Sequence, residues 1–289
     1  MSRETSAAQS DTPLGIIAGQ GNLPLQIAQA QQKAGREVFI IGINNEAEAA
    51  ISAFPHQWCE LIELKKSAEY LRQAGCKELV VIGAVQRPNL DKMKDDEGGQ
   101  WVMQKVMQNE QWGDDVLLST VIEYFATQGL QVRPAEAFYE PLKGPLGQQG
   151  ALAMGTHEAD ALRGVDVARA IGRLDIGQCV VVARRITLAV EGPEGTDAML
   201  ARVAGLPEAL RGTAEARCGV LVKLPKPQQD RRVDLPTIGV ATVTQAAQAG
   251  LAGIVYEAGG AILADVQATI AAADAAGLFL LGIEKSENE

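Results

Sequence analysis

Residues 14–43 read LGIIAGQGNLPLQIAQAQQKAGREVFIIGI, and this stretch decides the fold. An apolar run at residues 14–18 predicts a short buried strand, which leads through a glycine turn into apolar residues at helical spacing over residues 24–34. Gly35 ends that helix, and the apolar run at residues 37–43 predicts a second buried strand. A strand, a tight turn, a helix and a strand form a βαβ unit, which indicates a predominantly parallel sheet.

The same alternation of apolar runs and helical periods continues to the end of the chain. In the first half it predicts helices at residues 67–74 and within 99–128, and strands at residues 78–83 and 130–134. In the second half it predicts helices at residues 158–172, 197–203, 242–249 and 265–276, and strands at residues 179–183, 186–190, 219–224, 253–257 and 278–283.

Five prolines and glycines fall within residues 141–150. Such a run interrupts regular structure and predicts a domain boundary. We therefore expect an α/β protein of two α/β domains. The first, residues 14–140, is a Rossmann-like parallel sheet, and the second, residues 151–289, carries a charged loop rich in proline. Residues 1–13 are predicted to be a disordered tail.

Composition and charge exclude several classes of protein. With 47% hydrophobic residues and 289 residues in all, the chain can bury a sizeable core. A net charge of −10 argues against binding to nucleic acid, which needs a basic surface. The four cysteines form no CxxC pair and there are only two histidines, which argues against a zinc site and indicates free thiols in a reducing compartment.

The sequence also predicts where the protein resides. We find no apolar run of the roughly 20 residues that span a bilayer, and the first residues have no apolar segment typical of a signal peptide. We expect a cytoplasmic protein whose contact with the inner membrane, if made, is peripheral.

The glycine turn after the first strand is a candidate anion site. Gly19 and Gly21 permit a tight turn, and the following helix offers free backbone N–H groups. A dinucleotide fingerprint requires a third glycine where this chain has Pro24, and an acidic residue where it has Asn44. The turn is therefore either a plain strand-to-helix connection or an anion site, and its sequence counts against NAD.

Two further segments allow a structural and a functional interpretation. Asp114 and Asp115, after Gly113, are adjacent carboxylates that can ligate a divalent cation or cap a helix. The loop at residues 191–197 connects a strand to a helix, where ligands often bind in α/β proteins. Its Thr196 and Asp197 can equally cap that helix.

The most informative segment is residues 223–239, because it combines charge with rigidity. Three prolines exclude a regular helix or a central strand. Its charged residues are Lys223, Lys226, Asp230, Arg231, Arg232 and Asp234. Lysine and arginine neutralise phosphate oxygens, and aspartate ligates Mg²⁺, so the loop suits diphosphate hydrolysis.

Other features narrow the chemistry. A strand at residues 253–257 ends in Glu257 and predicts a carboxylate at the sheet edge. The chain has no GxSxG, P-loop or HExxH motif, and we interpret His157 as a polar loop residue rather than a base. Attack by water with the help of a metal is therefore favoured over covalent catalysis.

Taken in order, these segments resemble the LpxI family of UDP-2,3-diacylglucosamine pyrophosphatases of lipid A biosynthesis. The motifs that carry the resemblance are GIIAGQGNLP at residues 15–24, GDD at 113–115, RLDIGQ at 173–178, EGTD at 194–197, KPQQ at 226–229 and RVDLPTIG at 232–239. The resemblance spans residues 13–283, and the last two motifs are its most specific part.

The resemblance implies Mg²⁺-dependent hydrolysis of UDP-2,3-diacylglucosamine to 2,3-diacylglucosamine 1-phosphate and UMP. It also implies a homodimer, and a lipid product held between two α/β domains. Asp234 is the position that it marks as indispensable, with Asp230 less strictly required. We expect catalytic roles for Asp234, Lys223, Lys226 and Arg232, metal ligation by Asp234, Asp197 and Glu257, and substrate contacts from Gly19, Gln20, Gly21, Leu23, Thr196, Gln229 and Thr237.

Two other functions remain open on the residues alone. The βαβ start is compatible with a nicotinamide-dependent oxidoreductase, although the missing glycine and acidic residue argue against it. A non-catalytic protein that binds a nucleotide sugar would share the same glycine turn and cationic loop.

Overall fold

The computed structural model describes residues 11–86, 96–108 and 114–285 of the chain. It divides into two compact units, Met1–Tyr139 and Glu140–Glu289, which we describe one at a time. The predicted tail at residues 1–13 lies mostly outside the described residues. In the described part of the chain, no helix is long and apolar enough to cross a membrane.

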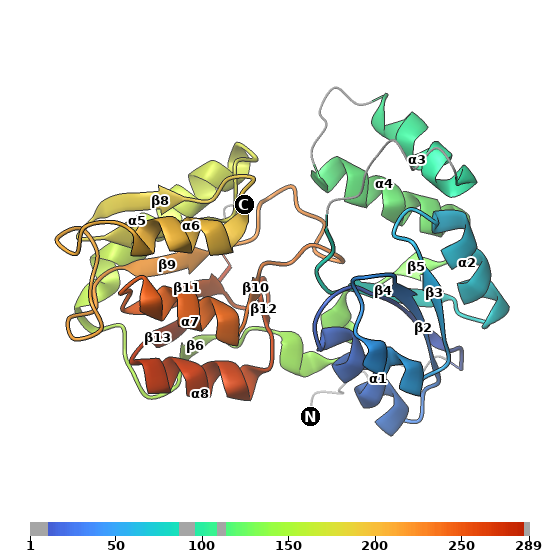
Figure 1. Ribbon diagram of the computed structural model, residues 1–289, viewed down its shortest axis with the longest axis horizontal. Helices are drawn as coiled ribbons and strands as arrows, with labels where there is room; N and C mark the ends of the chain where they lie inside the picture. Colours follow the sequence, from blue (N-terminus) through green and yellow to red (C-terminus); the bar gives the residue numbers. More distant parts are fainter. Residues whose placement is uncertain (1–10, 87–95, 109–113, 286–289) are drawn as a thin grey trace, which may run out of the picture. The chain divides into compact units, whose positions relative to one another are not determined.

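The first unit is built on a five-stranded, all-parallel sheet with the order β3-β2-β1-β4-β5 (Figure 1). Its strands are β1 (Leu14–Ala18), β2 (Val38–Ile43), β3 (His56–Cys59), β4 (Glu78–Ile82) and β5 (Gln131–Val132). Its helices are α1 (Leu23–Lys33), α2 (Leu64–Gln73), α3 (Glu97–Val106) and α4 (Asp114–Thr127), with short 3₁₀ turns η1 (Ala49–Ala53) and η3 (Ala135–Ala137). The strand order confirms the predicted α/β class and parallel sheet.

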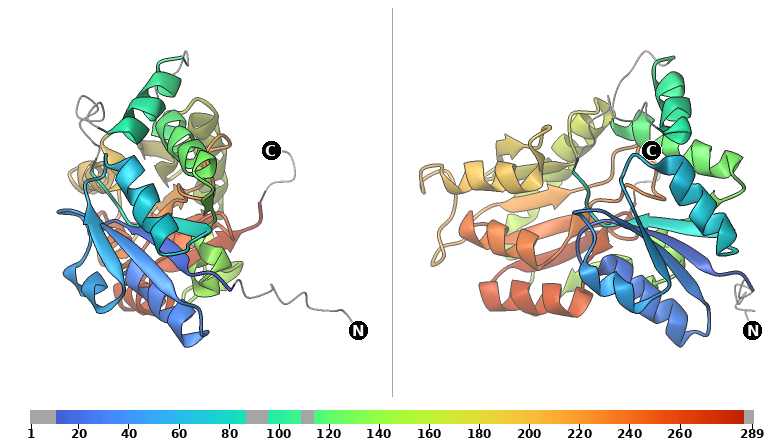
Figure 2. Two further views of the ribbon diagram at one scale, coloured as in Figure 1. Left: turned by 90° about the vertical axis from the view of Figure 1, so that its right-hand side faces the viewer. Right: turned by 45° about the vertical axis from the view of Figure 1, so that its right-hand side comes forward.

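The direction of winding reverses between β1 and β4. The chain moves outward from β1 to β2 and β3, then returns to place β4 on the other side of β1. Right-handed crossovers therefore put α1 and α2 on opposite faces, as Figure 2 shows. In sheets of this kind, ligands bind beyond the carboxyl ends of the strands at the reversal, which here are Ala18 and Ile82.

The second unit contains a six-stranded mixed sheet with the order β6-β13-β11-β9-β7-β8. Its strands are β6 (Gly147–Gln149), β7 (Cys179–Ala183), β8 (Ile186–Val190), β9 (Val220–Lys223), β11 (Gly253–Glu257) and β13 (Phe279–Ile283), and a separate parallel pair is formed by β10 (Thr237–Ile238) and β12 (Ile262–Leu263). Its helices are α5 (Glu158–Arg173), α6 (Gly195–Ala204), α7 (Val240–Gln248) and α8 (Val266–Ala276), with 3₁₀ turns η4 (Glu140–Leu142) and η5 (Gly155–His157).

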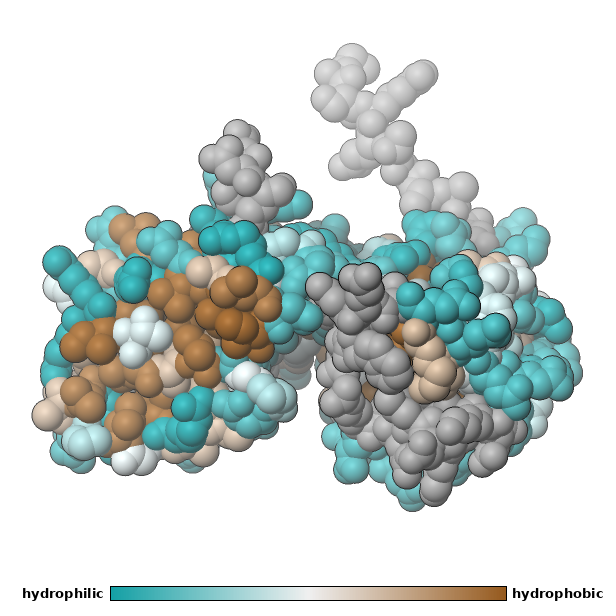
Figure 3. All heavy atoms as spheres, turned by 90° about the horizontal axis from the view of Figure 1, so that it is seen from above, coloured by the Kyte–Doolittle hydropathy of each residue, from teal (hydrophilic) through white to brown (hydrophobic). Residues whose placement is uncertain are grey.

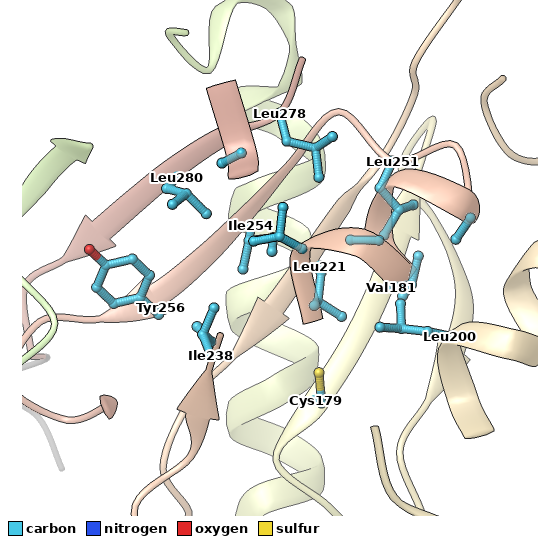
Figure 4. Close-up of a cluster of buried hydrophobic side chains, with 14 of the residues drawn as sticks. Cys179, Val181, Leu200, Leu221, Ile238, Leu251, Ile254, Tyr256, Leu278 and Leu280 are labelled. Atoms are coloured by element: carbon cyan, nitrogen blue, oxygen red, sulfur yellow. The ribbon is translucent and has the colours of Figure 1, made fainter. Parts of the chain in front are cut away.

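Both faces of this sheet are buried, because successive side chains of a strand point to opposite sides. Val181, Leu221 and Ile254 pack with α6, α7 and α8 in the cluster that Figure 4 shows. Val180 and Val222 pack on the other face with residues of α5. Burial on both sides explains why these strands are continuous apolar runs in the sequence.

Several elements differ from the sequence-based expectation. The predicted helical stretch at residues 99–128 contains two helices, α3 and α4. Strand β3 reads HQWC and was not predicted, because an edge strand needs few apolar residues. Strand β6 lies within the proline- and glycine-rich residues 141–150, where backbone pairing with β13 holds it in place.

The topology of the second unit brings distant segments to one edge. Strands β9 and β11 are parallel, so Lys223 and Glu257 both lie at their carboxyl ends. Strand β7 is antiparallel to β9 and starts at that same edge, with Cys179 opposite Lys223. Strand β8 ends there as well, because it is antiparallel to β7, so Glu191 directly follows it at this edge.

Candidate functional site

The glycine turn of the first unit is a close contact between two backbones. Gly19 N donates to Ile82 O over 2.9 Å, and Gln20 N donates to Ala84 O over 2.8 Å. A β-carbon at Gly19 would lie 2.5 Å from the carbonyl oxygen of Ala84, so only glycine fits. The turn thus joins the ends of β1 and β4, which is a structural reason for its first glycine. Gly21, at φ +89°, reverses the chain just before α1.

A carboxylate that the sequence analysis did not select holds this turn. Glu46, three residues after β2, accepts a hydrogen bond from the Gln20 side chain and one from Gln86 N at 3.1 Å. The N-cap residue Asn22 makes no side-chain hydrogen bond to α1. The first turn of α1 therefore keeps backbone N–H groups that an anion could bind, and the assignment of Gly19, Gln20, Gly21 and Leu23 to substrate stays a prediction.

In the second unit, Lys223 and Glu191 form the centre of a buried polar cluster. Both residues are more than nine-tenths buried, and Lys223 Nζ donates to Thr237 O over 3.0 Å. The Glu191 carboxylate accepts hydrogen bonds from Gln178 N (3.0 Å) and from Thr196 Oγ1 (2.6 Å). Burial raises the pKa of the adjacent Cys179 thiol to about 12, against the effect of the Lys223 ammonium.

The loop after β9 is tied to the segment before β7 by two side chains. Gln229 Nε2 donates to Gln178 Oε1 over 3.2 Å, while Gln229 Oε1 accepts from Lys226 N over 3.0 Å. The Lys226 ammonium forms an ion pair with Asp175 at 2.7 Å. Three motifs that are far apart in the sequence, at residues 173–178, 194–197 and 226–229, therefore meet at one edge of the sheet.

Farther along the same loop, two arginines are held by carboxylates. The Arg232 guanidinium donates to both carboxylate oxygens of Asp230, with Nε–Oδ1 at 2.9 Å and Nη2–Oδ2 at 2.6 Å. This contact lowers the pKa of the Asp230 carboxyl and raises that of the guanidinium. Arg231 Nη2 instead reaches the buried Glu257 carboxylate at 2.9 Å.

Asp234 lies at the end of this turn. Its backbone N–H donates to Asp230 O over 3.0 Å, and its side chain is partly buried. Asp197 is exposed in the first turn of α6, where a carboxylate stabilises the helix dipole. The expectation that Thr196 or Asp197 caps α6 is wrong: the N-cap residue is Glu194, which makes no side-chain cap hydrogen bond, and the Thr196 hydroxyl bonds to Glu191 instead.

The predicted metal ligands do not form a ready-made site in this structure. Within residues 11–86, 96–108 and 114–285, no group of three or more His, Cys, Asp or Glu side chains could hold a metal ion. Glu257 is engaged by Arg231. Gly113 of the predicted Gly-Asp-Asp pair lies outside the described residues, as do the side chains of Asp114 and Asp115.

The parallel sheet of the first unit, with its reversal between β1 and β4, is Rossmann-like. Together with the mixed sheet and helices of the second unit, it defines an α/β protein. Comparison with known families then identifies both units. The model of the LpxI N-terminal domain matches residues 13–142, and that of the LpxI C-terminal domain matches residues 146–281. The chain belongs to the LpxI family.

A curated relative and solved structures complete the comparison. The UDP-2,3-diacylglucosamine pyrophosphatase LpxI of Caulobacter vibrioides is 45% identical over 275 residues, which are 95% of this chain and 98% of the relative. A precorrin-6A reductase, CobK, has a TM-score of 0.33 at 11% identity and covers 95% of this chain and 88% of its own. The UDP-glucose 4-epimerase of Thermus thermophilus has a TM-score of 0.32 at 12% identity, covering 95% and 86%. Scores this low carry no argument about function.

Proposed function

We propose that the chain hydrolyses UDP-2,3-diacylglucosamine to 2,3-diacylglucosamine 1-phosphate and UMP. The oxygen of water forms a bond to one phosphorus, one bond of the bridging oxygen breaks, and the protons of water pass to the products. The 45% identity to a relative named for this activity supports the proposal. It also favours hydrolysis over the oxidoreductase and over the binding protein.

The observation that carries the proposal is the polar edge of the second unit. Residues of the RLDIGQ, EGTD and KPQQ motifs are joined there by hydrogen bonds to Gln178, Glu191 and Gln229. Buried, fully bonded polar networks hold side chains rigidly. A rigid set of cations is suited to stabilising the charge that develops on a diphosphate as it is cleaved.

We assign charge stabilisation to Lys223, Lys226 and Arg232. Each is already positioned by an oxygen acceptor, namely Thr237 O for Lys223, Asp175 for Lys226 and Asp230 for Arg232. Such anchoring lowers the reorganisation needed when phosphate oxygens arrive. Thr237 bonds to Lys223, Gln229 to the backbone of Lys226, and Thr196 to Glu191. These three residues are proposed to contact substrate. The glycine turn of the first unit is proposed to bind an anionic part of it.

We also propose that the reaction uses Mg²⁺. Mg²⁺ is usually held by one or two carboxylates together with substrate phosphates, a mode that does not need a ready-made cluster. Asp234 is the main candidate for this role, because its backbone is fixed by a hydrogen bond to Asp230 and the residue is partly exposed. Asp197 and Glu257 are secondary candidates, and Glu257 would have to leave Arg231. Bound at Asp234, Mg²⁺ would polarise a phosphoryl oxygen.

A single-turnover experiment tests the activity. The full chain is incubated with UDP-2,3-diacylglucosamine in ¹⁸O-labelled water with Mg²⁺, and with EDTA in a parallel sample. We expect UMP and the sugar 1-phosphate, one of them carrying the label, and no product with EDTA. If the substrate stays intact under both conditions, the proposed hydrolysis is refuted and the binding-protein alternative is favoured. Product formation undiminished by EDTA would refute the metal.

The resemblance also supports a cytoplasmic homodimer, which we retain as a proposal. Light scattering of the purified chain during gel filtration measures its mass directly. One chain has a mass of 30.6 kDa, and we expect twice that mass. A measured mass equal to that of a single chain would refute the dimer.

A further inference from the structure

The two units expose different kinds of surface. On the second unit, apolar side chains gather on the face that Figure 3 shows, and such a face offers no hydrogen bonds to the nucleotide end of a substrate. Polar contacts lie instead at the carboxyl-terminal edge of the first unit's sheet, where the winding reverses between β1 and β4. Ligands of parallel α/β sheets bind at such a reversal. One carboxylate there, that of Glu46, has no assigned part in the proposed hydrolysis.

The turn after β2 places Glu46 beside the glycine turn that follows β1. The two strands are parallel and pair up to their carboxyl ends, so the residues that follow them lie at the same edge of the sheet. Asn45 is left-handed, with φ 64°, a conformation that asparagine tolerates better than most residues. Hydrogen bonds to Ile43 O from Glu46 N (3.1 Å) and from Ala47 N (2.9 Å) close the turn. The backbone of Glu46 is therefore held in a short, closed turn.

Two neutral donors occupy part of the Glu46 carboxylate. Gln20 Nε2 donates to Oε2, and Gln86 N donates to Oε1 over 3.1 Å. A carboxylate has about four lone-pair positions, so each oxygen keeps one. Among the described residues no lysine or arginine pairs with Glu46, which is itself partly exposed. Its charge is thus held in place without being neutralised, and each oxygen can accept one more hydrogen bond.

These two acceptor positions select the chemistry of a ligand. A carboxylate accepts hydrogen bonds and donates none, so a phosphate, which is also an anion and an acceptor, is repelled. A metal ion is disfavoured, because two N–H donors already point at the same oxygens and Mg²⁺ requires oxygen ligands around it. Two adjacent hydroxyl groups fit, each donating to one oxygen, and a hydrogen bond from a hydroxyl to a carboxylate is short and strong. The site therefore suits a vicinal diol.

We infer that Glu46 binds the two hydroxyl groups of the substrate's ribose. The inference rests on the proposed function, whose substrate carries one vicinal diol, that of the ribose. Acyl groups occupy positions 2 and 3 of the glucosamine, which leaves no two adjacent hydroxyls on that sugar. In nucleotide-binding α/β sheets an acidic residue shortly after the second strand holds the ribose. Asn44 stands where the dinucleotide fingerprint has that residue, but the turn after β2 brings Glu46 to the same edge.

This assignment places the nucleoside half of the substrate on the first unit. Gln20, which bonds to Glu46, belongs to the glycine turn that is proposed to bind an anionic part of the substrate. In a nucleotide the ribose is bonded directly to its phosphate, so a diol at Glu46 and an anion at the neighbouring turn belong to one ligand. A purely structural role for Glu46 predicts a different behaviour, because a loosened turn would weaken the binding of every nucleotide alike.

Calorimetry with UMP and its 2′-deoxy and 3′-deoxy analogues tests the inference on the full chain, in EDTA so that no metal contributes. We expect wild type to bind each deoxy analogue at least about tenfold more weakly than UMP, because a hydrogen bond to a charged group is lost. Glu46→Gln should bind UMP as weakly as wild type binds the analogues, and should distinguish the three ligands by less than about twofold. Glu48→Gln removes the same charge from an exposed residue that makes no side-chain cap hydrogen bond. This matched control should behave like wild type.

The other outcomes each decide against one part of the account. Equal binding of UMP and both analogues by wild type would overturn the inference without the need for any variant, as would a wild-type chain that binds none of them. A Glu46→Gln variant that binds all three ligands less tightly but keeps the discrimination would show a structural role and overturn it as well. If Glu46→Gln instead loses discrimination against substrates that lack the 4- or 6-hydroxyl of the glucosamine, the carboxylate holds the acylated sugar and the ribose assignment is wrong. Ribose-dependent binding of UMP without any hydrolysis of the substrate would refute the proposed function and leave the inference standing.

Discussion

Replacing Thr196 by valine tests whether the buried Glu191 carboxylate depends on its partners. The hydroxyl of Thr196 lies 2.6 Å from a carboxylate oxygen of Glu191, which is 6% exposed. Water cannot easily replace the lost donor at that depth, so one hydrogen bond to a charged group is removed. Such a bond contributes about 1.5–3 kcal/mol. We expect the free energy of unfolding to fall by about 2 kcal/mol.

Urea denaturation measures this change. With a slope of about 2 kcal/mol per molar urea, the midpoint should fall by about 1 M. All three tryptophans, Trp58, Trp101 and Trp112, lie in the first unit, so circular dichroism rather than tryptophan fluorescence follows the second unit.

Thr244→Val is the matched control for this measurement. Its hydroxyl is exposed and donates to Val240 O of its own helix, at 2.8 Å. This variant should stay within about 0.5 kcal/mol of wild type. If Thr196→Val and Thr244→Val shift the midpoint equally, the buried cluster does not contribute as argued.

Three further predictions concern the loop and the thiols. Arg231→Ala should lower the free energy of unfolding measured in urea by about 2 kcal/mol, because it leaves the buried Glu257 carboxylate without its ion-pair partner. Arg231 itself is part-exposed, which limits the loss. Adding Glu257→Gln should restore most of the lost stability, because the buried charge is then removed. Asp230→Asn should destabilise less at pH 2 than at pH 7. The folded pKa of Asp230 is lowered, so its contribution is present above the unfolded pKa of about 3.9 and is lost as pH falls through the folded pKa. A constant difference between these two pH values would contradict the ion pair. Iodoacetamide should label Cys218 first in the native chain, since the other three thiols are buried, and mass spectrometry of peptides shows the order.

The core strands could be predicted from the sequence because burial on two faces leaves a continuous apolar run. The predicted strands at residues 179–183 and 186–190 coincide with β7 and β8. The parallel sheet of the first unit followed from the glycine turn and the alternation of strand and helix. Strands β10 and β12 have two residues each, which is too short to leave a pattern. Strand β3 is held by backbone pairing at an edge, so its side chains carried no signal.

The candidate site could be predicted only in part. The charged loop after β9 was evident, because lysines and arginines stand there among prolines. Its partners were not: Gln229 meets Gln178 across 51 positions only because β7 inserts antiparallel to β9. Glu46 likewise meets Gln20 across 26 positions, through the parallel pairing of β1 with β2. Such contacts depend on strand order, which local patterns do not specify.

We propose that the loop after β9 in the second unit presents Asp234 to a diphosphate. Steady-state release of UMP by Asp234→Asn, with the urea midpoint measured in parallel, tests this most directly. We expect kcat to fall at least about 100-fold, as when a group that acts on the reacting atoms is lost, with an unchanged midpoint. Turnover by Asp234→Asn at the wild-type rate would contradict the claim.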